Sequence, residues 1–354
     1  MAPSAAHQPP KHLGIGVGLA LVVTVIVLAF SWPAVTADPR NVPLAITGPE
    51  EQVAAVSAAL DQHLGDAVAL TTVADRDAAV RAVERRAVYG AIVLGPDPEV
   101  LKATAASPVA AQLVEGTKVP LGQLLAAMTQ TLVPEGNAGP VDQAGPAPAA
   151  DQAAVTVLVT DVVPLLEADS RGSGLAAATL PLVLGGLVGG VAISLLVVGI
   201  WRRIAALAVY AVAAGLLITG VLQTWFGVLA GAYLANAAVF TACLLAIGST
   251  IVGFASLLGR PGIPVGPVLF LLVANPIAGV TMPPEFLPTG WGTIGQLFPP
   301  GAGATLVRNV SYFPDASTTA PWLVLTGWTV LGLALATLAH RRAPRTEPAT
   351  APAA

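Results

Sequence analysis

The sequence predicts a mainly α-helical membrane protein: a bundle of six transmembrane helices (one plus five) with an extracytoplasmic α/β domain inserted between the first and second helices. Of the 354 residues, 55% are hydrophobic and only 10% are charged, whereas soluble domains carry about 25% charged residues. The charges are also segregated: residues 38–169 hold 17 of the 20 acidic and 7 of the 16 basic side chains, and residues 204–258 hold none. A solvated, acidic block therefore interrupts an apolar chain.

Six apolar segments are long enough to cross a bilayer, which takes about 20 residues per helix. They are residues 13–35, 174–200, 204–226, 228–258, 263–282 and 321–339, of which 263–282 is the least regular. The chain accordingly divides into a tail (1–12), the first helix (13–35), an external domain (36–172), a five-helix membrane block (173–340) and a second tail (341–354).

Basic residues beside these segments predict the orientation, because Lys and Arg stay on the cytoplasmic side. With six spans, one side carries Lys11, Arg202, Arg203, Arg260 and, after the last span, Arg341, Arg342 and Arg345. Both termini are then cytoplasmic, and the protein is a multi-pass protein of the inner (plasma) membrane. Val35-Thr36-Ala37 also resembles a signal-peptidase site. The length of the apolar run favours a retained anchor, and cleavage would leave the external domain on the same side.

The external domain has the pattern of a small α/β layer. Residues 42–46, 68–73 and 89–94 are short apolar runs typical of strands. Between them, residues 53–64 repeat apolar side chains at helical spacing, and Asp75 is placed to cap a second helix. We expect a further helix at 121–132, a Pro/Gly/Ala-rich linker at about 134–153, and a strand within 155–163. Gly95-Pro96-Asp97-Pro98 predicts a turn before a helix.

No pattern in the chain indicates catalysis or a cofactor. The acidic residues Asp75, Asp77 and Glu84 are best explained as solvated helix charges, and no G-x-S-x-G sequence is present. A lone Cys243 excludes an intramolecular disulfide, and four scattered histidines show no metal-ligand spacing. The chain is not basic enough to indicate nucleic-acid binding. We therefore assign no catalytic, cofactor or metal residues.

The membrane block contains small residues at close-packing intervals. Gly185, Gly186, Gly189 and Gly190 form two overlapping G-x-x-x-G spacings, which allow helix backbones to approach closely in lipid. Packing within the bundle is the favoured interpretation, and homodimerisation is the alternative. No carboxylate or basic residue lies deep in a span, which argues against an ion-coupled transporter. We expect Asn236 and Asn275 to hydrogen-bond between helices, with substrate contact as the alternative.

The fifth span is broken by prolines, including Pro276, and is followed by a long apolar segment at 283–313. That segment is too apolar for a plain loop, and its aromatic residues suit a membrane interface. We expect one or two short helices that lie at the outer face, or re-enter the membrane from it, and pack on the bundle.

This layout resembles the ABC-2 type permeases, and within them the YhgE/Pip-like branch. Three parts of the chain carry the resemblance: residues 82–94 with 105–108, residues 161–165 with 174–190, and residues 286–301. The resemblance implies a permease half that dimerises and exports a hydrophobic, lipid-like or peptide-like substrate, driven by a separate ATPase. No G-x-x-x-x-G-K-[ST] sequence is present in this chain.

The chain departs from that family in its short cytoplasmic parts. The first tail holds three prolines in 12 residues, and the loop between the second and third spans is little more than Trp201-Arg202-Arg203. The candidate residues for docking an ATPase are Arg202, Arg203 and Arg260. The alternative function is a non-transporting scaffold or receptor, whose external domain binds a partner or envelope component.

If the protein transports, we expect the second and fifth spans to line the path. The candidate residues for helix packing or for the path are Gly185, Gly186, Gly189, Gly190, Asn236, Asn275 and Pro276. Replacing Gly186 or Gly189 with Leu would then abolish export without stopping membrane insertion.

Overall fold

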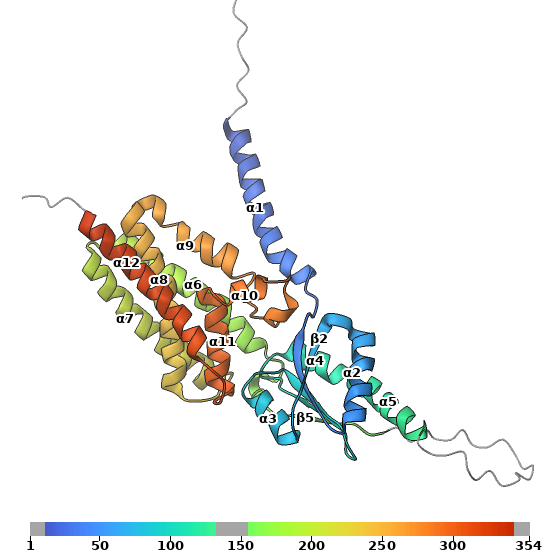
Figure 1. The fold of residues 1–354 in the computed structure, drawn as a ribbon. Coiled ribbons are helices and arrows are strands. Elements are labelled where there is room, and N and C mark those ends of the chain that lie inside the picture. Colours follow the sequence, from blue (N-terminus) through green and yellow to red (C-terminus); the bar gives the residue numbers. More distant parts are fainter. Residues whose placement is uncertain (1–10, 132–154, 343–354) are drawn as a thin grey trace, which may run out of the picture.

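A computed structural model describes residues 11–131 and 155–342. The expected linker at 134–153 lies outside these ranges, as do most of the first tail and nearly all of the second. The described part of the chain begins with helix α1 (Lys11–Val35), which leans away from the other membrane helices, and continues into an α/β domain (Figure 1). The remaining helices form a bundle beside that domain.

The α/β domain is built on one five-stranded sheet of order β2-β1-β3-β4-β5. Its strands are β1 (Val42–Thr47), β2 (Val68–Thr72), β3 (Gly90–Val93), β4 (Glu99–Lys102) and β5 (Leu158–Asp161). Only β3 and β4 pair antiparallel; the other neighbours are parallel. The strands β1, β2, β3 and β5 confirm the four strand predictions. Strands β1 and β3, in the interior of the sheet, are almost entirely buried, as apolar strands of a parallel sheet usually are.

The helices of this domain are α2 (Glu50–Leu64), α3 (Arg76–Glu84), α4 (Pro108–Gly116) and α5 (Lys118–Thr131). Asp75 caps α3 as predicted, because its carboxylate accepts a hydrogen bond from Ala78 N at 2.7 Å. The expectation of a helix after Gly95–Pro98 was wrong. The turn instead leads into β4, which begins at Glu99. This residue is buried, and its carboxylate accepts hydrogen bonds from Arg76 and Thr160, which allow a charged side chain to lie inside the sheet.

Within residues 11–131 and 155–342, five helices are long and apolar enough to cross a membrane. They are Gly14–Val35 in α1, Thr179–Leu196 in α6 (Ser173–Leu196), Ile200–Trp225 across α7 and η3, Tyr233–Leu258 (α8) and Thr319–Arg341 in α12 (Thr319–Arg342). Helix α7 (Ile200–Thr219) runs directly into the π-helix η3 (Gly220–Trp225). Helix α8 is the centre of the bundle, since α6, α7, α11 and α12 all pack against it.

The sixth predicted span, 263–282, forms a shorter apolar helix at Arg260–Ala274. It consists of the 3₁₀ turn η4 (Arg260–Gly262), α9 (Val265–Pro267) and the π-helix η5 (Val268–Ala274). The segment that follows contains the 3₁₀ turn η6 (Pro284–Phe286), α10 (Trp291–Gly295) and α11 (Pro299–Tyr312). Most residues of α11 are buried, so the short helices do pack on the bundle as expected.

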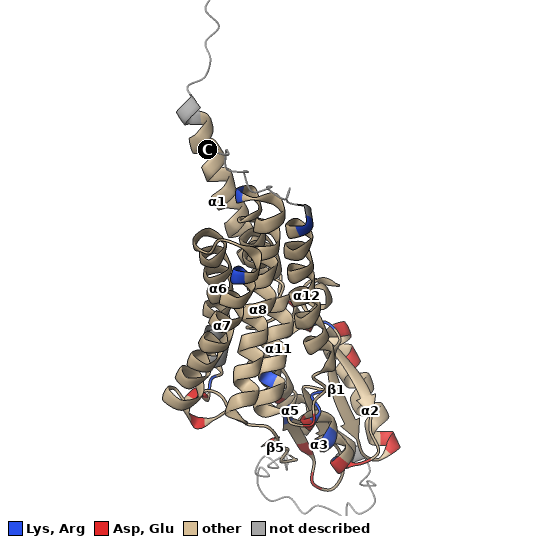
Figure 2. Cartoon of the chain, turned by 90° about the vertical axis from the view of Figure 1, so that its left-hand side faces the viewer, with Lys and Arg blue, Asp and Glu red and all other residues tan. Residues whose placement is uncertain are grey.

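Charge separates along the molecule. Figure 2 shows most of the acidic residues over the α/β domain, while basic residues occur there and also at the opposite end of the bundle, where α12 ends. Figure 1 shows that the start of α1 and the end of α12, which are the described ends of the chain, lie away from the α/β domain.

Candidate functional site

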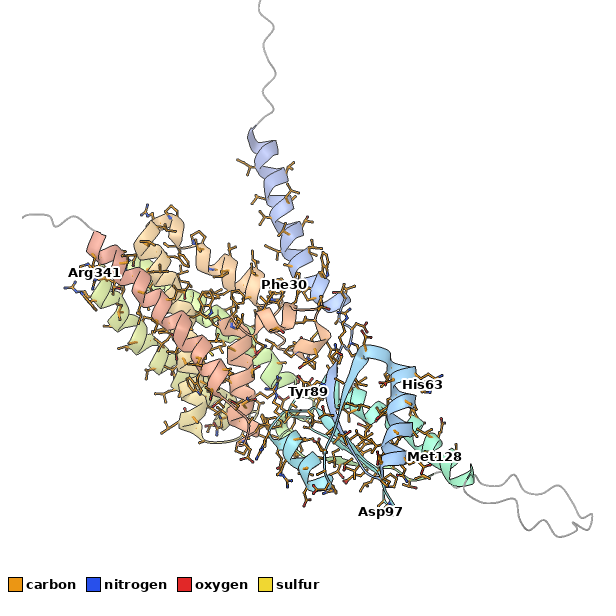
Figure 3. All side chains as sticks on the ribbon, viewed as in Figure 1. Phe30, His63, Tyr89, Asp97, Met128 and Arg341 are labelled. Atoms are coloured by element: carbon orange, nitrogen blue, oxygen red, sulfur yellow. The ribbon has the colours of Figure 1, made fainter. Side chains whose placement is uncertain are left out.

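A groove of about 250 Å³ lies between α1, α6 and the segment that follows η5. Its walls are Phe30, Pro33 and Ala34 from α1, Ala176, Thr179 and Leu180 from α6, and Asn275, Pro276, Gly279, Val280, Thr281, Met282 and Leu287 from the third wall. Figure 3 shows Phe30 on α1, at the side that faces the short helices. Among the residues that the sequence analysis singled out, Asn275 and Pro276 line this groove.

The third wall is irregular for local chemical reasons. The π-helix η5 ends at Ala274, and the N–H of the next residue, Asn275, donates to Phe270 O at 3.0 Å, five residues back. Pro276 then lacks the N–H that would continue the ladder. Gly279 takes a left-handed φ of +65°, and the chain reverses there against Pro284. The result is non-helical backbone at the edge of the bundle, which π-helices and interrupted helices frequently provide at functional sites.

The four glycines Gly185, Gly186, Gly189 and Gly190 lie on faces of α6 that do not line this groove. A Cβ at Gly186 would approach Ile247 to 2.8 Å, and one at Gly190 would approach Ile251 to 3.0 Å, both on α8. Gly189 lies directly against the Tyr210 ring of α7, and Gly185 O accepts a hydrogen bond from Tyr210 OH at 2.8 Å. None of the four lines the groove, so we expect leucine at Gly186 or Gly189 to act through helix packing.

Asn236 is fully buried near the start of α8 and joins three elements. Its Nδ2 donates to Gln223 Oε1 at 3.0 Å in η3 and to Ala230 O at 2.8 Å. Its Oδ1 accepts from Ser311 Oγ at 3.0 Å in α11. The side chain therefore bonds between segments of the bundle, as one of its two interpretations anticipated.

The three arginines suggested for docking differ in availability. Arg202 and Arg260 are exposed. Arg203 instead donates within the chain, from Nε to Val197 O at 2.7 Å, from Nη2 to Ser194 O at 2.8 Å and from Nη1 to Ser256 Oγ at 3.3 Å. Its guanidinium closes the turn between α6 and α7, and little of it is left for a partner.

A polar cluster that sequence reasoning missed joins the α/β domain to the segment after η5. It consists of Arg86, Tyr89, Glu285, Arg308 and Asn309, and we name it the junction cluster. Arg86 Nη1 donates to Asn309 Oδ1 at 2.7 Å, and Tyr89 OH donates to Glu285 Oε2 at 2.9 Å. Figure 3 shows Tyr89 between the sheet and the helices.

The α/β domain presents its share of the cluster on the turn between α3 and β3. Arg86 adopts a left-handed φ of +55°, which is uncommon for a residue with a Cβ and costs about 1 kcal/mol. Its guanidinium lies 6.0 Å from the Phe313 ring centroid, within cation–π range. The free-energy cost of the strained turn is thus offset by contacts that form only when the α/β domain packs against the membrane helices.

The cluster holds two guanidinium groups and one carboxylate. Arg308 is only 8% exposed; its Nη2 lies 3.5 Å from Val280 O, and its buried Nε has no hydrogen-bond partner among the described residues. Burial, reinforced by the Glu285 carboxylate, raises the pKa of Tyr89 above its ordinary value. Burial lowers the pKa of Arg86, with Tyr89 and Glu285 opposing that shift. Tyr89 therefore stays a neutral hydrogen-bond donor.

One signal in the sequence could have located the cluster. Arg308 is the only charged residue between Glu285 and Asp315, in a segment otherwise apolar enough to pack on the bundle. A lone arginine in such a segment needs a buried partner or an aqueous path. The α/β half of the cluster is distant in the sequence, since Arg86 and Asn309 are 223 positions apart, and nothing in the local pattern identifies it.

The residues that the structure describes contain no group of three or more His, Cys, Asp or Glu side chains arranged to hold a metal ion. Comparison of the chain with protein-family models, curated proteins and solved structures finds no match.

Proposed function

We propose that the protein is an ABC-2-like permease subunit of the plasma membrane that exports a hydrophobic or envelope-related substrate, with energy from a separate ATPase. In this proposal the α/β domain is extracytoplasmic, both termini are cytoplasmic, and the Arg260–Ala274 helix completes a one-plus-five set of membrane helices. The observation that carries the proposal is the groove between α1, α6 and the interrupted segment after η5, with Asn275 in its wall.

The groove suits a hydrophobic substrate because its wall is mostly apolar and it opens at the edge of the bundle, not through its centre. Helix α8 occupies the centre, and its buried polar side chains Asn236, Ser249 and Thr250 hydrogen-bond within the bundle. A substrate that is soluble in lipid can reach an edge groove sideways from the bilayer. A helix with few neighbours, such as α1, can move to admit it.

The orientation is tested by cysteine labelling in intact cells. Cys243 is buried and the only cysteine, so Cys243→Ala supplies a background without reactive thiols. Asp97→Cys at the exposed turn of the α/β domain is expected to react with a membrane-impermeant maleimide. Arg341→Cys at the end of α12 is expected to react only after lysis. Labelling of Arg341→Cys in intact cells would show that the protein has the opposite orientation in the membrane.

The ATPase partner is tested by purification from native membranes followed by photolabelling with an azido-ATP analogue. We expect a labelled subunit to copurify with the wild type and to be lost from the Arg202→Glu/Arg260→Glu double variant. Arg171→Glu, an exposed arginine beside the α/β domain, is the matched control and should retain it. Retention by the double variant, or the absence of any ATP-binding subunit, would contradict the proposal.

The groove itself is tested by filling it. With the purified complex in proteoliposomes, Ala34→Trp should abolish ATP-dependent movement of a fluorescent single-chain lipid. Val22→Trp, on a part of α1 that does not line the groove, should leave it unchanged. Equal rates in the two variants would place the path elsewhere.

A scaffold or receptor is the second candidate function, and the geometry of Arg203 favours it. With that side chain held inside the chain, only Arg202 and Arg260 remain of the suggested docking residues. Recovery of envelope proteins without an ATP-binding subunit in the purification above would support this second function.

A further inference from the structure

A second groove, of about 670 Å³, lies between α6 and α7 at the end of the bundle next to the α/β domain. It is separate from the groove beside α1. Its lining residues are Ala168, Asp169, Ser173, Gly174, Pro181, Leu182, and on the α7 side Leu217, Ile218, Val221, Leu222, Phe226 and Val228. Asp169 and Ser173 supply polar groups at one end, and the rest of the wall is nearly all apolar.

The groove exists because α6 and α7 touch in one half of their length and separate in the other. Tyr210 of α7 joins the two helices, because its OH donates a hydrogen bond to Gly185 O and its ring contacts Gly189. Beyond that point Pro181 interrupts the hydrogen-bond ladder of α6. On the facing side α7 widens into the π-helix η3. Two helix irregularities therefore face each other across the same space, and π-bulges recur at functional sites.

The apolar wall opens toward the lipid. Leu217 is 71% exposed, Phe226 56% and Val221 40%, and all three line the groove. In a bilayer such a surface meets acyl chains, which are as apolar as leucine side chains. A groove of this volume is within the range of specific ligand sites, about 300–1,000 Å³. A lipid chain is therefore the occupant that the surroundings supply.

The polar end of the groove contains the carboxyl group of Asp169. Asp169 is 5% exposed, and its Oδ1 accepts from Gly174 N at 2.9 Å and from Ser173 Oγ at 3.4 Å. These bonds fix its position at the start of α6, between the α/β domain and the membrane helices. A fixed carboxylate beside an apolar groove complements a cationic headgroup and repels an anionic one.

We propose that this groove binds a phospholipid with a primary-ammonium headgroup, of the phosphatidylethanolamine class, from the leaflet next to the α/β domain. One acyl chain lies between Pro181 and η3, and the ammonium group meets Asp169. A primary ammonium can donate hydrogen bonds to the carboxylate, whereas a choline headgroup cannot, and a glycerol headgroup leaves the lipid anionic.

The test uses the full chain, purified in detergent and depleted of lipid, with three phospholipids of identical acyl chains carrying ethanolamine, choline or glycerol headgroups. Binding is followed by native mass spectrometry and by the rise in melting temperature on lipid addition. The wild type should bind the ethanolamine lipid about tenfold or more tightly than the other two. Asp169→Asn should reduce that preference to near unity.

The groove is tested independently of Asp169 by a matched pair on α7. Leu217→Trp fills the groove and should abolish bound lipid. Val209→Trp, at a position on the same helix that is also 71% exposed but does not line the groove, should bind like the wild type. Equal binding of the three headgroups by the wild type would overturn the headgroup assignment. Retention of lipid by Leu217→Trp would overturn the site.

Discussion

Replacing Glu285 with Leu is expected to destabilise the protein by about 3 kcal/mol, whereas replacing Arg308 with Met is expected to leave its stability unchanged or raise it. The junction cluster contains two guanidinium groups and one carboxylate. Removing the carboxylate leaves two like charges in a poorly solvated place and takes the acceptor from Tyr89 OH. Removing Arg308 leaves one positive and one negative charge, and it also removes a buried Nε that has no partner among the described residues.

The comparison is made by thermal or denaturant unfolding in one detergent. Glu51→Leu, at an exposed carboxylate of α2, reports the effect of losing a solvated negative charge and should change stability little. The double variant Glu285→Leu/Arg308→Met is expected to recover most of the lost stability, because it leaves the junction cluster with one guanidinium group in place of two and no carboxylate. A fall in stability for both single variants would mean that hydrogen bonding or packing, and not net charge, governs this junction.

Replacing Gly332 with Ala is expected to cost about 2 kcal/mol or more, while Gly327→Ala on the same helix is expected to cost nothing. A Cβ at Gly332 would collide with the backbone of Ser249 in α8, and Gly253 of α8 in turn lies against Gly332 O. Because the atoms in the way are backbone, no side-chain rotation relieves the overlap. A Cβ at Gly327 meets nothing within 4 Å.

The measurement is the melting temperature of each purified variant, with membrane insertion checked by the amount recovered in the membrane fraction. Both variants should insert, since neither changes the apolar length of α12. Equal melting temperatures for Gly332→Ala and Gly327→Ala would show that α8 and α12 do not pack as closely as the structure describes.

Local patterns predicted most of the secondary structure because each depends on neighbouring residues. Strand β1 follows from an apolar run closed by Gly48-Pro49, and α3 follows from the Asp75 cap. The helix expected after Gly95–Pro98 failed because the residues after the turn pair with β3, a contact that turn chemistry alone does not reveal. The fifth span was expected at 263–282, and its prolines indicated that it would be irregular without indicating how short it would be.

The candidate sites were less accessible to sequence reasoning, because they depend on contacts between distant segments. Asn275 and Pro276 were singled out from the sequence, but α1 as a wall of their groove was not. Ala34 of α1 and Asn275 line the same groove although they lie far apart in the chain, and no pattern near either residue indicates that they meet. The junction cluster is a similar case, because Arg86 and Asn309 come from different parts of the molecule and meet only in the fold.

The short linker between α1 and β1 connects the first helix to the segment after η5 as well as to the sheet. Asp38 N donates to Phe286 O at 3.0 Å and Arg40 N to Glu285 O at 3.1 Å, so this linker runs alongside η6. Directly after it, Asn41 takes a left-handed φ of +52°, and its N–H bonds to Asp66 O. Any tilt of α1 is therefore transmitted to residues 285–286 before it reaches the sheet, and Asn41 is the point at which the chain changes direction between the two.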